Sequence, residues 1–144
     1  MASPLDDVIT TIVADVEALV PETRATVRYF YLDGSMTPHT GATSDRGFGF
    51  SIPSAEVLSL RGSVAETRYT FDLILLLTEQ SMSPHAFRQA VYSEANAVRA
   101  AIDARSVWPS GVIQVSTRGY DVATDSETRD VEVSITLSVV TEEN

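Results

Sequence analysis

The chain has no cysteine and no lysine among its 144 residues. The absence of cysteine excludes disulfide bonds, thiolate metal sites and cysteine nucleophiles, and it favours an intracellular setting only weakly. The absence of lysine excludes a P-loop for nucleotide phosphates and a Ser-x-x-Lys catalytic pair. A Gly-x-Ser-x-Gly nucleophile motif is missing as well.

Long apolar runs and an N-terminal export signal are also lacking. No segment reaches the roughly 18 to 20 consecutive apolar residues that a membrane-spanning helix needs. Asp6 and Asp7 place negative charge ahead of the first apolar run, whereas a secretory signal has positive charge there. We therefore expect no membrane partner and no export by the secretory route.

The positive charges are all arginines, and the net charge is −10. This composition is typical of a high-GC genome or of a high-salt host, and the sequence leaves these two explanations open. So negative a chain is not expected to grip DNA over a broad surface, because neutralising phosphates requires clustered cations. The charge is compatible with a surface past which DNA moves without binding.

Length and composition indicate one compact domain spanning residues 1–144, since 44% hydrophobic residues suffice for a core. Two amphipathic helices are predicted, over residues 4–20 and 84–105. Each begins with a serine N-cap followed by proline, at Ser3 and Ser83, and Pro21 ends the first helix. Their apolar stripes are Leu5, Val8, Ile9, Ile12, Val16, Leu19 and Val20 in the first helix, and Phe87, Val91, Ala95, Val98 and Ile102 in the second.

Strands are predicted from β-branched and aromatic residues and from alternation, over residues 25–32, 48–52, 67–78, 112–117 and 130–140. Residues 55–60 are compatible with a short strand or a turn. In the strand 67–78 both faces become apolar in the second half, so we expect that half to be covered on both sides. The order α-β-β-β-α-β-β predicts an α+β fold, in which both helices pack on one face of a mainly antiparallel sheet.

Two segments are candidates for contacts with other molecules. Residues 35–47 are rich in Gly, Ser, Thr and Pro without any period, which predicts a mobile loop with a functional or interface role. In the last strand, 130–140, apolar and polar residues alternate from Val131 to Val139, and we expect its edge to be free for pairing with a neighbour.

No catalytic, metal or cofactor site is predicted. His39 and His85 lack neighbouring ligands, and Gly47-Phe48-Gly49 does not open a helix as a dinucleotide fingerprint would. The carboxylates Asp121, Asp125, Glu127 and Asp130 fall in an expected hairpin loop without the spacing of a calcium loop. A solvated acidic loop is the favoured interpretation, and we expect the protein not to be an enzyme.

Charged residues instead suggest docking. Asp72 lies between apolar neighbours and is either an exposed position or a partner for an arginine of another subunit. Five arginines in the first half, Arg24, Arg28, Arg46, Arg61 and Arg68, lie away from the acidic loop in sequence. Arginine suits interface ion pairs with carboxylates. A nucleic-acid patch is the alternative, which the overall charge disfavours.

In layout the chain resembles the tail terminator and tail-completion proteins of long-tailed viruses of bacteria and archaea. The resemblance comprises the N-terminal amphipathic helix, a strand followed by a long loop (residues 35–47), a strand followed by a long helix (residues 68–105), and a final hairpin ending in RDVEVSITLSVVTEE. It covers most of the chain and rests on no invariant motif.

The resemblance implies a virion protein without catalytic residues or cofactor, located at the head–tail junction and assembled in the host cytoplasm. It implies a ring of identical subunits, typically a hexamer, that caps the tail tube, docks to head or neck connector proteins and lets DNA pass without sequence-specific binding. The expected interface residues are Arg28, Arg46, Arg61, Arg68, Asp72, Asp121, Asp125 and Glu127. The expected loop contacts to tube or neck are Met36, His39, Asp45 and Phe48.

Three other functions stay open on the sequence. A head-completion or neck connector protein of the same kind of particle would share this layout. A monomeric α+β ligand-binding or regulatory domain comes from a different class, and a small enzyme is the third alternative. Oligomeric state separates the first from the other two.

Overall fold

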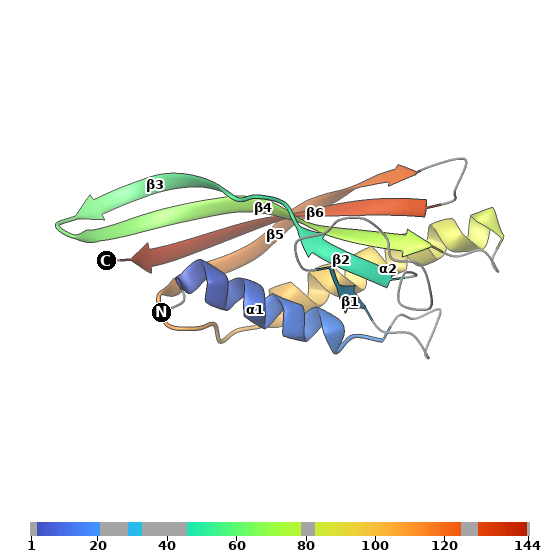
Figure 1. Ribbon diagram of the computed structural model, residues 1–144, viewed down its shortest axis with the longest axis horizontal. Coiled ribbons are helices and arrows are strands. Elements are labelled where there is room, and N and C mark those ends of the chain that lie inside the picture. Colours follow the sequence, from blue (N-terminus) through green and yellow to red (C-terminus); the bar gives the residue numbers. More distant parts are fainter. Residues whose placement is uncertain (1–2, 21–28, 33–45, 79–82, 125–129, 144) are drawn as a thin grey trace.

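A computed structural model describes residues 3–20, 29–32, 46–78, 83–124 and 130–143 (Figure 1). Within these residues a six-stranded sheet has two helices on one of its faces (Figure 1). The elements in chain order are α1 (Pro4–Glu17), β1 (Phe30–Tyr31), β2 (Arg46–Phe50), β3 (Ser54–Arg61), β4 (Val64–Thr78), α2 (Pro84–Ala104), β5 (Val112–Thr124) and β6 (Asp130–Glu143).

The predicted fold class is confirmed, and the predicted element order matches once β3 is added as a further strand before α2. The sheet is mainly antiparallel, and only the short pair of β1 and β2 is parallel. The segment 55–60, for which strand and turn were both open, belongs to strand β3. Strand β5 is longer than the predicted 112–117 and reaches Thr124.

Helix α1 begins as its sequence predicts and ends three residues early. Ser3 Oγ accepts a hydrogen bond from the Asp6 backbone N–H, and the Asp6 carboxylate accepts one from the Ser3 N–H, which completes a capping box. At the other end the Leu19 N–H donates to the Val16 carbonyl, so the last turn tightens and the helix stops at Glu17.

Strand β4 is the central strand of the sheet. Along one side it pairs with β6 from Ala65 to Thr78, and along the other it pairs first with β3 and then with β2. Strand β6 therefore lies between β4 and β5, in the interior of the sheet. The expectation that the last strand has a free edge is wrong, because β4 and β5 occupy both of its sides.

The core lies between the sheet and the helices. Alternate residues of β4 and β6 point at the helices and are fully buried, as Leu73, Leu75 and Ile135 illustrate. The opposite face of the sheet, here called the helix-free face, is covered by neither helix (Figure 1). Ile74 and Leu76 on that face are half-buried, so among the described residues the expected covering of both faces is partial.

Strand β3 and the first part of β4 form a hairpin that projects beyond the helices (Figure 1). Its turn contains Gly62, whose φ of +65° lies in the left-handed region that glycine adopts without strain. We call residues 54–70 the arm. Among the described residues, neither helix is both long and apolar enough to cross a membrane.

Candidate functional site

A buried ionic network lies where β2, β4 and α2 meet. The Arg46 Nε–H donates to Glu94 Oε1 at 2.7 Å, and Nη2 donates to Oε2 at 3.0 Å. The Tyr29 hydroxyl donates to the same Oε1 at 2.7 Å, and Arg46 Nη1 donates to the Thr78 carbonyl at 3.1 Å. The guanidinium therefore makes a bidentate contact with the Glu94 carboxylate and a further hydrogen bond to the last residue of β4.

This network belongs to the interior of the protein. Arg46 and Glu94 are 0% and 1% exposed, and burial raises the pKa of the Tyr29 hydroxyl well above its ordinary value, with the Glu94 charge adding to the rise. A side chain enclosed in this way cannot reach another subunit. The predicted docking role of Arg46 is wrong, because the predicted loop ends earlier and Arg46 opens strand β2.

The partner of Arg46 was missed by the sequence reading, although a signal was present. Glu94 lies three residues after Val91 and seven after Phe87, so it shares the apolar stripe of α2. A glutamate on a buried stripe needs a buried cation or donor. Arg46 satisfies that need from 48 residues away in sequence.

Phe48 is likewise a core residue. It lies in β2, is fully buried, and packs at ring-centroid distances of 5.4 Å from Tyr31 and 6.3 Å from Phe50. Its expected role as a loop contact to tube or neck is wrong, because alternation along β2 points its ring at the helices rather than outward. Gly47, on the other face, lies against Leu32.

Four other predicted interface residues lie on the described surface of the sheet. Arg61 is exposed at the end of β3, and Arg68 lies opposite Glu56 across the arm. Asp72 is half-buried and accepts a hydrogen bond from the Thr136 hydroxyl at 3.0 Å. Asp121 is exposed on β5 rather than in the hairpin loop, which corrects its predicted position. Their roles between subunits stay predictions.

Six predicted contact residues lie outside the described residues, together with most of the loop 35–47. They are Arg28, Met36, His39, Asp45, Asp125 and Glu127.

Acidic side chains predominate on the helix-free face. The strand registers place on it the carboxylates of Glu56, Glu66, Asp72, Asp121, Glu132 and Glu142. In the regularly paired part of the described strands, Arg61 and Arg68 are the basic residues of this face. Glu66 and Glu142 stand directly opposite each other on neighbouring strands, an arrangement that weakens a sheet. This face therefore has an excess of negative charge that the fold itself does not require.

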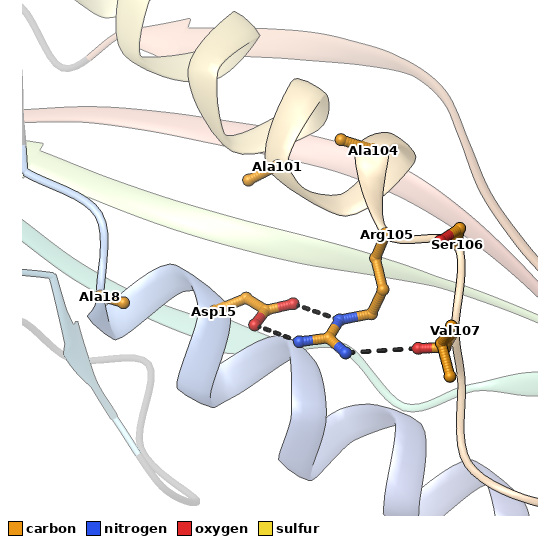
Figure 2. A pocket seen from close by; sticks show the side chains of 7 residues that line it. All are labelled: Asp15, Ala18, Ala101, Ala104, Arg105, Ser106 and Val107. Carbon is orange, nitrogen blue, oxygen red and sulfur yellow. Dashed lines mark hydrogen bonds and ion pairs between the residues drawn. The ribbon is translucent and has the colours of Figure 1, made fainter.

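A hollow of about 500 Å³ lies on the helix layer, between the C-terminal ends of α1 and α2 (Figure 2). Arg105 donates from Nε and Nη2 to Asp15 at 2.7 and 2.6 Å, and from Nη1 to the Val107 carbonyl at 3.3 Å. The hydrogen bond to Asp15 raises the pKa of Arg105 above its usual value. The two charges neutralise each other, and the remaining lining is mostly alanine.

Nothing in the described residues assembles into a metal site. No group of three or more His, Asp or Glu side chains lies close enough there to hold an ion. His85 is exposed in the first turn of α2. The described surface thus offers sheet edges, the arm and a charged face.

Comparison with solved structures gives a fold relationship. The chain superposes with a TM-score of 0.63 on a chain of a structure described as the virion of a native gene transfer agent particle. The match covers 92% of each chain at 12% sequence identity, so it shows a shared fold. No protein-family model matches the sequence. No curated protein matches it either.

Proposed function

We propose that the chain is a structural protein of a phage-like particle, and that it forms a ring capping the tail tube where the tail joins the head or neck. The observation that carries this proposal is the fold shared, over nearly the whole of both chains, with a component of a gene transfer agent virion. The layout of the sequence points to the same class of protein independently of that match.

The distribution of charge supports a passage for DNA. If the helix-free face lines the ring, its six carboxylates face the DNA and its two arginines are too few to neutralise phosphates. A wall of this kind repels DNA at all distances within a Debye length. Repulsion between the carboxylates, in particular between the facing Glu66 and Glu142, destabilises the sheet. The proposed DNA passage gives these carboxylates a function that offsets this loss of stability.

Assembly of the purified protein tests the ring. Mass photometry over a range of protein and salt concentrations should show one discrete oligomer, which for six copies of the 15.6-kDa chain is about 94 kDa. Negative-stain electron microscopy should show particles with a central opening. A monomer at every concentration, by both methods, would contradict the proposal and favour a monomeric binding domain.

DNA binding tests the role of the charged face. The assembled protein should leave the mobility of duplex DNA unchanged even at low ionic strength, where attraction between a basic surface and phosphates is strongest. A variant with Glu66→Arg, Glu132→Arg and Glu142→Arg should retard the DNA under the same conditions. Retardation of DNA by the unmodified protein would contradict a non-adhesive passage.

A further inference from the structure

The sheet has two long edges that run in opposite directions. Among the described residues β3 pairs only with β4, and β5 pairs only with β6. The strand pairs β3–β4, β4–β6 and β6–β5 are all antiparallel. If a second copy is placed beside the first in the same orientation, its β5 therefore runs antiparallel to β3, and the alternation of strand directions continues across the junction.

Both edges expose aliphatic side chains. Val57 and Leu60 of the arm are 57% and 72% exposed, and Ile113 at the start of β5 is 53% exposed. Monomeric proteins usually protect such edges with charged residues, proline or β-bulges. Neither β3 nor β5 contains lysine or proline. The pairing of β3 has one irregularity, between Val57 and Ser59, and that of β5 has two, between Val112 and Gln114 and between Thr117 and Gly119.

The exposed residues of the two edges lie at the same height along the sheet. The registers place Val57, Thr67, Thr141 and Val112 in one row across the four strands. A neighbour displaced sideways, without a shift along the strands, thus brings its Val112 opposite Val57, with Ile113 as the next residue along β5. Charges of both signs flank this point on the two edges, with Glu56 and Arg61 on β3 and Arg118 on β5.

We propose that β3 of one copy pairs with β5 of the next, with Val57 beside Val112 and Ile113, so that the sheets of neighbouring subunits join into one. The proposal rests on the ring function proposed above and specifies its subunit contact. The interface is heterologous, because a different edge is used on each side, and it closes into a ring when the rotation between neighbours divides a full turn. Backbone hydrogen bonds supply affinity, as in other strand additions.

A second copy suits these edges better than a twofold partner. In a symmetric dimer through β3, the exposed Ile113 edge of each chain stays open to a further strand. In head-to-tail pairing, a single type of contact covers both edges of every subunit.

Cysteine cross-linking tests the junction directly, because the natural chain contains no thiol. The variant Val57→Cys/Ile113→Cys carries one thiol on each edge. Within a chain these thiols are separated by three interstrand spacings, about 14 Å, which is too far for a disulfide. Under mild oxidation we expect a ladder of covalent trimers and larger species on a denaturing gel without reductant. An equimolar mixture of the two single variants should stop at covalent dimers.

The outcomes separate the junction from the ring. Covalent dimers in Val57→Cys alone, or in Ile113→Cys alone, would indicate a twofold contact and overturn the proposal. No cross-linking in any variant would overturn it too, and rings seen by electron microscopy in the same samples would then preserve the proposed function. A ladder without closed particles would support the edge pairing and count against the ring.

A charge substitution gives an independent readout. Leu60→Glu puts a carboxylate on the exposed face of the arm, beside the junction, where it meets no core residue of its own chain. We expect the oligomer to dissociate at least tenfold more readily on dilution, with the far-UV circular dichroism and the unfolding midpoint of the monomer unchanged. Full assembly of this variant would contradict burial of the arm between subunits.

Discussion

The second half of β4 and the arm lie in different surroundings. From Phe71 to Leu77, alternate side chains are buried under the helices, and the strand ends beside a buried arginine whose hydrogen bonds are supplied within the chain. In the arm, Val57 and Leu60 are exposed although they are aliphatic. In the covered half the buried charges are paired within the chain, whereas the arm exposes aliphatic side chains that the proposed subunit contact would cover. If the proposed pairing is correct, stability and assembly depend on different parts of one sheet.

The largest effect should come from breaking the buried network. Glu94→Gln removes the carboxylate that holds Arg46 and leaves a buried guanidinium without its counter-charge. We expect a loss of about 3–5 kcal/mol in the free energy of unfolding, measured by urea denaturation followed by circular dichroism. Glu132→Gln on the exposed surface of β6 is the matched control, and an equal loss in both variants would show that the network contributes nothing of its own.

Substituting one leucine of the core and one of the arm compares how much each region contributes to the unfolding free energy. Leu75→Ala opens a cavity in the core and should cost about 2–5 kcal/mol. Leu60→Ala removes the same atoms from the arm and should change the unfolding free energy of the monomer by less than about 0.5 kcal/mol. Both are measured at protein concentrations below assembly. A comparable loss at Leu60 would mean that the arm is part of the cooperative core.

The covered half should also be the more sensitive to alkaline pH. The pKa of Tyr29 is raised in the folded state, so the folded protein holds that proton more tightly than the unfolded chain does. Stability is then fully present below the ordinary tyrosine pKa of about 10 and falls as the pH rises above it, by up to about 1.4 kcal/mol per unit for one proton. Chemical denaturation at pH 9 to 11 measures the slope. Tyr29→Phe should reduce it, and an unchanged slope would exclude Tyr29 as its source.

The smallest effect is expected at the surface ion pair. Arg105→Gln breaks the contact with Asp15, but both groups are then hydrated by solvent. The unfolding midpoint should shift far less than in Glu94→Gln, and the shift should shrink further in high salt. A shift of the unfolding midpoint as large as that of Glu94→Gln would mean that the ion pair between the helices stabilises the fold as much as the buried pair does.

Local sequence patterns predicted most elements because their causes are local. Serine caps followed by proline located both helix starts, and alternation located β4 and β6. Residues 55–60 were harder, because a bulge within β3 interrupts its period. The early end of α1 was missed since apolar residues continue beyond Glu17 and the tightened last turn leaves no mark in the sequence.

The exposure of the residues named as interface candidates was predictable only in part. Asp121 and Arg61 were named from charge, and both are exposed. Arg46 was placed in the loop 35–47 by composition, and Phe48, at the start of the predicted strand 48–52, was named as a contact beside that loop. The pairing of β2 with β4 places both side chains in the core. Glycine-flanked residues next to a polar segment give no local sign of such pairing.

The sequence by itself determined the α+β class, the helix starts, the faces of the strands and the excess of negative charge, because each depends on neighbouring residues or on composition. Tertiary structure alone decided that β6 lies inside the sheet, that β3 and β5 are its long edges, and that Glu94 neutralises Arg46. These features depend on contacts between residues far apart in the chain. Many pairings of the same strands satisfy the local patterns, and only packing of the whole core selects one of them.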